Sequence, residues 1–147
     1  MTLPIRSWRR RWAPVLLLLA LAGCGDNVTS PETRRARWES RGTSNYTYVS
    51  AYACECAPEF ALPLQVTVAN NVVTSVRTVA TGQPAPLNYR PTIGGLFDLI
   101  ETEQRNRPAN LEVAYDATLG YPTRIKYGTP ENDAGGIITV TSLTITR

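Results

Sequence analysis

A short apolar segment near the start of the chain decides which residues are available to fold into a domain. Four arginines between residues 6 and 11 precede an apolar run from Ala13 to Ala22. This run is about 10 residues long, half of the roughly 20 that a membrane-spanning helix needs. A cationic start followed by a short apolar run and small residues is typical of a secretory signal peptide. We therefore predict a signal peptide over residues 1–23, which leaves residues 24–147 as the mature chain.

The predicted cleavage site carries a cysteine. The signal peptide runs into Leu21-Ala22-Gly23-Cys24. Small residues before a cysteine resemble the lipobox of bacterial lipoproteins, in which the cysteine is diacylated and becomes the first mature residue. The resemblance implies a lipid at Cys24 that anchors the chain to a membrane of the cell envelope. Gly25 follows in place of aspartate, which favours the periplasmic face of the outer membrane in a host with two membranes. Residues 24–30 then form a tether, about 20 Å long beyond the cysteine when extended, ahead of one domain over residues 31–147.

Removal of the signal peptide also changes the charge of the chain. The whole sequence carries 15 basic and 12 acidic side chains, a formal net charge of +3. Four of the arginines belong to the signal peptide, so 11 basic groups face 12 acidic groups in the mature chain. A net charge near −1 gives no support for binding to nucleic acid.

The sequence contains no histidine, which removes the commonest general base and the imidazole metal ligand. Triads of the Ser-His-Asp or Cys-His type are therefore excluded. Two cysteines besides Cys24 fall short of the four ligands of a closed zinc site. We predict no catalytic residues, no metal site and no cofactor. Carboxylates such as Asp98, Glu101 and Asp116 would have to converge in one cleft to support hydrolysis.

Cys54 and Cys56 are left as a pair once Cys24 carries a lipid. Thiols outside the cytoplasm tend to form disulfides. In an extended strand, however, the Cα atoms of residues two apart are about 6.6 Å from each other, near the upper limit for a disulfide. A bond within this motif therefore needs a bulge or a bend, which Ala57-Pro58 would supply. A structural disulfide is favoured, and free or intermolecular thiols and a redox or copper(I) site are the alternatives.

Two helices are indicated in the mature chain. Ser30 suits the N-cap of the first helix and Pro31 its first position. This helix is expected to run to Arg41, with Trp38 as its anchor into the core. Thr92 caps the second helix. Its apolar stripe consists of Ile93, Leu96, Phe97 and Ile100.

Six alternating or β-branched runs predict strands. They span residues 45–56, 64–69, 72–80, 111–115, 123–127 and 137–145. Asn70-Asn71 joins two of them as a tight turn, because asparagine tolerates positive φ. The order of helix, three strands, helix and three strands predicts an α+β fold of two αβββ halves. These would form one largely antiparallel sheet with both helices on one face.

Tyrosines mark one face of the first predicted strand. Tyr46, Tyr48 and Tyr52 alternate along it and therefore point the same way. Tyr121 belongs to a separate loop over residues 116–122, with the aromatic ring at its tip. We take the tyrosine-bearing sheet face and the Tyr121 loop as candidate binding surfaces. For the loop, the alternative is a rigid strand connection in which Tyr121 packs on the sheet.

Arginines gather on the first helix. Arg34, Arg37 and Arg41 fall on one arc at 100° per residue. One interpretation is a solvated face. The other is contact with anionic lipid headgroups, which the short tether would bring close and which contributes about 1 kcal/mol per charge near a surface.

A set of short motifs runs along the mature chain. They are Trp38, Tyr46-x-Tyr48, Cys54-x-Cys56, Pro91-Thr92, Leu96-Phe97, Tyr115-Asp116 and Gly120-Tyr121-Pro122. This combination is similar to that of an uncharacterised family of bacterial lipoprotein domains. The resemblance covers most of the mature chain and implies a secreted, membrane-anchored α+β domain. It carries over no activity and no catalytic residue.

Together these observations predict a non-catalytic binding or scaffolding module of the bacterial cell envelope, anchored to the membrane through its lipid. Its partner would be an envelope protein or a glycan. One alternative is a thiol-disulfide or copper-handling protein that uses Cys54 and Cys56. A second is a carboxylate-based hydrolase.

Overall fold

The structure, a computed structural model, describes residues 30–128 and 135–146. The predicted signal peptide, Cys24 and most of the tether lie outside the described residues. In chain order the elements are α1 (Pro31–Glu39), β1 (Tyr46–Ala53), α2 (Pro58–Ala61), β2 (Leu64–Ala69), β3 (Val72–Thr78), the 3-10 helix η1 (Leu87–Tyr89), α3 (Ile93–Asn106), the 3-10 helix η2 (Pro108–Asn110), β4 (Glu112–Tyr115), β5 (Pro122–Tyr127) and β6 (Gly136–Ile145).

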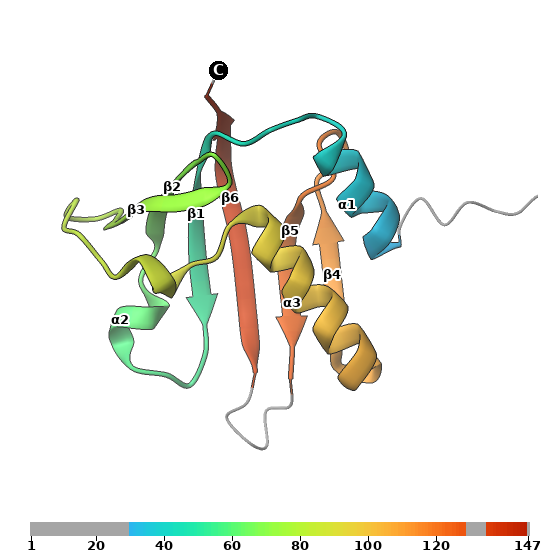
Figure 1. Ribbon diagram of the computed structural model, residues 1–147. Helices are drawn as coiled ribbons and strands as arrows, with labels where there is room; N and C mark the ends of the chain where they lie inside the picture. Colours follow the sequence, from blue (N-terminus) through green and yellow to red (C-terminus); the bar gives the residue numbers. More distant parts are fainter. Residues whose placement is uncertain (1–29, 129–134, 147) are drawn as a thin grey trace, which may run out of the picture.

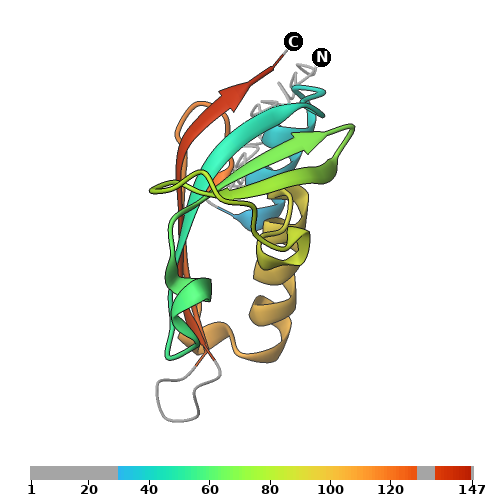
Figure 2. The same cartoon turned by 90° about the vertical axis from the view of Figure 1, so that its left-hand side faces the viewer.

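The six strands form one antiparallel sheet in the order β3-β2-β1-β6-β5-β4. Helices α1 and α3 pack against each other, and the two views show both on the same side of the strands (Figure 1 and Figure 2). The α+β class and the antiparallel sheet are thus confirmed. β1 and β6 pair along their length and make the sheet continuous, as one sheet requires, while the division into two αβββ halves stays a prediction.

Both helices begin where their capping residues predict. Ser30 Oγ accepts a hydrogen bond from the Thr33 N–H at the start of α1, and Thr92 Oγ1 accepts one from the Gly95 N–H in α3. Each cap satisfies one of the backbone donors that a helix leaves unpaired at its first turn. α1 ends at Glu39, two residues earlier than predicted.

The core lies between the sheet and the two helices. The apolar stripe of α3 is buried, and so is Trp38, which is the one buried residue of α1. The sheet contributes the alternate residues of each strand, as the period of two requires. These are Tyr46, Tyr48, Leu64, Val66, Val68, Val76, Ile125, Ile138 and Val140.

The first strand is shorter than predicted. β1 ends at Ala53, and Cys54 to Cys56 form a bend in place of three more strand residues. The short helix α2 follows with Pro58 at its first position, and the strand analysis did not predict it. A helix of four residues is too short to show apolar periodicity, so the sequence pattern does not indicate α2.

Tyr46 joins the sheet to α3. Its side chain is only 1% exposed, and its hydroxyl accepts a hydrogen bond of 2.9 Å from the Ile93 N–H, the first backbone donor of the helix. The neighbouring Tyr48 hydroxyl donates to the Pro91 carbonyl just before the helix. Two side chains of β1 thereby hold the segment from which α3 starts.

Replacing Tyr46 by phenylalanine tests this link. The substitution keeps the ring and leaves the buried Ile93 N–H without an acceptor, so Tyr46→Phe is expected to lower the free energy of unfolding by about 1–3 kcal/mol. Urea denaturation measures the change. Tyr89→Phe is the matched control, because the half-buried Tyr89 hydroxyl makes no hydrogen bond within the described residues. Equal stabilities of the two variants would contradict the capping role.

Candidate functional site

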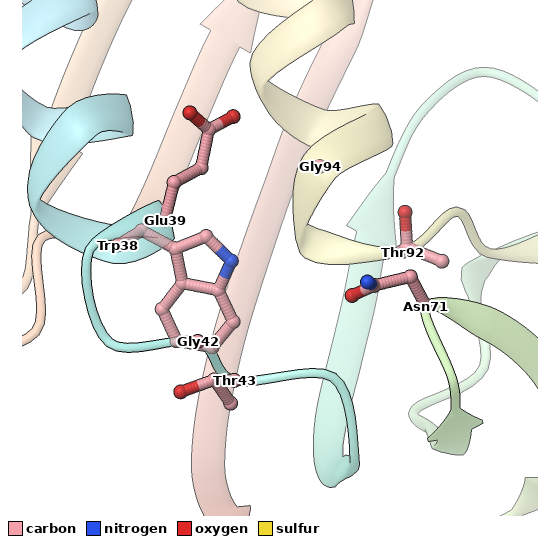
Figure 3. A pocket seen from close by; sticks show the side chains of 7 residues that line it. All are labelled: Trp38, Glu39, Gly42, Thr43, Asn71, Thr92 and Gly94. Carbon is pink, nitrogen blue, oxygen red and sulfur yellow. The ribbon is translucent and has the colours of Figure 1, made fainter.

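A pocket of about 370 Å³ opens where three connecting segments meet (Figure 3). They are the end of α1 with the loop after it, the turn between β2 and β3, and the first turn of α3. We call it the Trp38 pocket, and its lining residues are Trp38, Glu39, Gly42, Thr43, Asn71, Thr92 and Gly94.

Trp38 is a buried residue that lines this pocket. The side chain is 4% exposed and packs edge-on against Tyr46 and Tyr121, with ring centroids 5.3 and 6.0 Å away. Its ring nitrogen points toward the space beside the first turn of α3 (Figure 3). Within the described residues no hydrogen bond is formed by this indole N–H, and the nitrogen is not among the fully buried side-chain atoms that lack a partner. The tryptophan is thus buried as a whole, while its N–H is accessible from the pocket.

The first turn of α3 supplies a second free donor. The Ile93 and Gly95 N–H groups are capped by Tyr46 and Thr92, whereas the Gly94 N–H finds no acceptor in the part of the chain that the structure describes. The N-terminus of a helix carries a partial positive charge and attracts acceptors, anions above all. The first turn of α3 therefore gives one side of the pocket a backbone hydrogen-bond donor, the Gly94 N–H.

The turn between β2 and β3 forms the opposite rim. Asn70 and Asn71 both have positive φ, 52° and 61°, as a tight two-residue turn requires. The Asn71 N–H donates to the Ser44 carbonyl at 2.9 Å, and the Asn70 N–H donates to Asn45 Oδ1 at 2.8 Å. These bonds tie the turn to the loop after α1. The Asn71 side chain consequently lies at the pocket, across from Thr43 (Figure 3).

Glu39 is the acidic residue of the pocket and is paired with Arg35. Arg35 Nε lies 2.8 Å from a Glu39 carboxylate oxygen, and Arg35 Nη1 lies 2.8 Å from both Asp98 and Glu101. The hydrogen bonds that Arg35 donates to these three carboxylates raise the pKa of its guanidinium. Asp98 and Glu101 do converge, but on a guanidinium at the surface and not in either of the two described pockets.

Asp116, the third carboxylate considered for hydrolysis, has a structural role. Its Oδ1 accepts from the Thr118 and Leu119 N–H groups at 2.9 and 2.6 Å and so closes a turn. A catalytic cleft formed by Asp98, Glu101 and Asp116 therefore has no support in their positions.

The tyrosine-bearing sheet face is not a binding surface, and this correction follows from burial. Tyr46 and Tyr48 are each 1% exposed because both helices cover that face, and burial raises the pKa of both hydroxyls. Tyr52 is half-buried and its hydroxyl is 2.8 Å from that of Tyr127. Tyr121 packs on Trp38, so the alternative of a rigid connection describes its loop. Alternation shows that residues share a face but not which face the helices cover.

The arginines of α1 contact the loop over residues 116–120. Arg37 Nη1 donates to the Ala117 carbonyl and Arg41 Nη2 to the Thr118 carbonyl, both at 2.9 Å. The Arg34 guanidinium lies over the Tyr115 ring, 5.7 Å from its centroid. Neither interpretation from the sequence included these contacts. Contact of this arc with a membrane stays a prediction.

Gly120 shows why that loop lies so close to α1. Its φ is +85°, and a Cβ atom there would lie 2.8 Å from the Arg34 carbonyl oxygen. Only glycine meets both conditions without strain. The close approach brings the loop carbonyls within reach of Arg37 and Arg41.

Cys54 and Cys56 form a disulfide with their Cα atoms 5.2 Å apart. The bend after β1 brings the two Cα atoms closer together than the roughly 6.6 Å of an extended strand. The sequence analysis requires such a bend for a disulfide within this motif. The pair lies at the end of β1 opposite to Tyr46 and hence away from the Trp38 pocket. Within the described residues no group of three or more His, Cys, Asp or Glu side chains is placed to hold a metal ion.

Arg90 holds the segment that follows the disulfide. Its buried guanidinium donates to the Phe60 and Leu62 carbonyls at 2.7 and 3.3 Å, and burial lowers its pKa. Sequence analysis did not select Arg90, nor Thr43, Asn71 and Gly94 at the pocket. The one available signal for the pocket was the Gly94-Gly95 pair in the first turn of a helix, where glycine is unfavourable.

Comparison with protein families identifies one family that covers the predicted domain. Residues 31–144 match DUF6174, a family of unknown function. The chain belongs to this family. No curated protein and no solved structure matches the chain. Among the described residues of this DUF6174 domain, no helix is long and apolar enough to cross a membrane.

Replacing both cysteines separates the structural and redox interpretations of the disulfide. The double variant Cys54→Ser, Cys56→Ser is expected to lose no more than about 1.6 kcal/mol of unfolding free energy, because so small a loop restricts the unfolded chain little. Urea denaturation measures the loss. Trp38 emission is expected to stay unchanged, since the pocket lies at the other end of β1. Saturable copper(I) uptake or dithiol turnover by the wild type, lost in the variant, would support the thiol alternative instead.

Proposed function

We propose that this DUF6174 protein is a non-catalytic binding module of the bacterial cell envelope, anchored by a lipid on Cys24, and that the Trp38 pocket is its binding site. The observation that carries the proposal is the pair of free donors, the Trp38 indole N–H and the Gly94 N–H, at one cavity. Polar groups in protein interiors are almost always hydrogen-bonded, so an unused donor at a cavity indicates a ligand or water partner.

The size and the composition of the pocket support this function. A volume of about 370 Å³ lies at the lower end of the range for small-molecule sites, about 300–1,000 Å³. Its lining combines an indole edge, an amide, two hydroxyls and a helix N-terminus. Glu39 is its single ionisable residue, with no nucleophile and base in contact beside it. Such a site holds a ligand by hydrogen bonds and lacks the paired groups that acid–base chemistry needs.

The proposed anchor and the pocket are compatible in space. The tether enters at Pro31, at the start of α1, and the pocket lies at the end of that helix. A helix of nine residues is about 13 Å long. The pocket opening is thus separated from the attachment point by the length of α1, which leaves room for a ligand when the domain sits near the bilayer.

Metabolic labelling tests the anchor. Cells that express the full chain are grown with an alkyne-tagged fatty acid, which is expected to label the wild type and not Cys24→Ser. The double variant Cys54→Ser, Cys56→Ser is the matched control and is expected to keep the label. An unlabelled wild type, or a labelled Cys24→Ser variant, would contradict lipidation at Cys24.

Ligand screening tests the binding function. Trp38 is the single tryptophan of the mature chain, because Trp8 and Trp12 belong to the signal peptide, so its emission reports on the pocket. Envelope-type sugars, amino sugars, amino acids and short peptides are titrated against the processed full chain. At least one class is expected to change Trp38 emission saturably and to raise Tm.

A matched pair of variants makes this screen specific. Gly94→Leu fills the pocket beside the helix and is expected to abolish the response, whereas Gln104→Leu places the same side chain at an exposed position of α3 and is expected to preserve it. Absence of any saturable response, or equal responses of the two variants, would overturn the proposed function.

A further inference from the structure

We infer that the Trp38 pocket binds its ligand through a carboxylate group, which accepts hydrogen bonds from the Trp38 indole N–H and the Gly94 N–H. The inference deepens the proposed function and rests on it. Three observations carry it: a glycine that the fold does not require, an indole N–H without a partner on a buried tryptophan, and the charges around the pocket.

Gly94 is the glycine without a structural reason. Its neighbour Gly95 has one, since a Cβ atom there would lie 2.9 Å from Pro91 Cβ. A Cβ atom at Gly94 would meet only Thr92 Oγ1, at an ordinary contact distance of 3.6 Å, and its φ is not in the left-handed region. Alanine would therefore fit, and it favours a helix more than glycine does. The atom that it would add lies at the pocket, where it would limit the approach of a ligand to the backbone.

The Trp38 indole N–H is the second observation, independent of the helix. The side chain is more than nine-tenths buried, and its free N–H is directed at the space beside Gly94 (Figure 3). The ring cannot turn this donor elsewhere, because Tyr46 and Tyr121 hold it edge-on from two sides. A ligand acceptor placed beside α3 would satisfy the indole and the helix donor together.

The charges favour a carboxylate over other acceptors. The N-terminal end of a 14-residue helix stabilises a negative charge more than a neutral carbonyl. A phosphate group usually adds Lys or Arg contacts for its second charge, and neither residue lines the pocket. Glu39 would repel a dianion more strongly than a monoanion. The Glu39 carboxylate itself lies at the rim of the pocket, where its side chain is 58% exposed and paired with Arg35. The side of the pocket next to α3 therefore remains open to a ligand with one negative charge.

Titration with a matched pair of probes tests the charge requirement. N-acetylglycine and its neutral isostere N-acetylglycinamide are titrated against the processed full chain, with Trp38 emission as the readout. We expect N-acetylglycine to bind at least tenfold more tightly than the amide, and inorganic phosphate to bind more weakly than N-acetylglycine. Equal affinity for acid and amide, or tighter binding of phosphate, would overturn the carboxylate inference.

The variant Gly94→Ala tests the role of the glycine with two readouts of opposite sign. The added methyl group is expected to weaken N-acetylglycine binding at least tenfold while Tm rises by about 2–4 °C. Thr102→Ala, at an exposed position of the same helix, is the control, and it is expected to raise Tm without changing the affinity. A fall in Tm for Gly94→Ala would show that the fold itself requires glycine there, and this would overturn the inference.

Failure of the inference is distinguishable from failure of the proposed function. If neutral sugars change Trp38 emission and carboxylates do not, the carboxylate inference is wrong and the binding function stands. If no compound in either experiment changes the emission, both are wrong.

Discussion

The packing of Trp38 between Tyr46 and Tyr121 is the contact on which most of the structure depends. Trp38 brings α1 to the sheet, Tyr46 belongs to the strand at the centre of the sheet, and Tyr121 precedes β5. Truncation of a buried tryptophan to alanine typically costs about 3–5 kcal/mol, a large part of the stability of a domain of this size. Tyr46 also caps α3 through its hydroxyl, so the same cluster sets where the second helix begins.

The candidate site is a consequence of this contact. Because the indole is held edge-on, its N–H cannot turn away from the cavity, and the Tyr46 cap places the first turn of α3 beside it. The asparagine turn closes the other side through its hydrogen bonds to the loop after α1. Residues that stabilise the fold thus also position the donors of the pocket, and the only glycine of α3 without a packing reason lies among them. The proposed binding function would need no flexible lid, since the donors at the pocket are already oriented.

Much of the local structure was predictable, because it depends on short-range chemistry. Ser30 and Thr92 cap the helices, and Asn70-Asn71 makes the tight turn. The disulfide required a bend after β1, and the bend is present. Errors arose where the answer depends on contacts between distant segments. Tyr46 and Tyr48 are buried although their alternation suggests a binding surface, because alternation does not reveal which face the helices cover. The arc of Arg37 and Arg41 is predictable, but its hydrogen bonds to carbonyls 80 and 77 residues away in the chain are not.

The amino-acid sequence by itself determined the two longer helices, the six strands, the absence of histidine chemistry and the prediction of a lipid-anchored chain that folds outside the cytoplasm. These follow from the type and the spacing of neighbouring residues. Only the tertiary structure decided that Trp38, Asn71 and Gly94 line one cavity. They come from three segments that are far apart in the chain, and no pattern within one segment shows that it meets the other two. The two donors without a partner among residues 30–128 and 135–146 are evident only from the tertiary structure, because a hydrogen bond is missing only relative to the positions of all nearby acceptors.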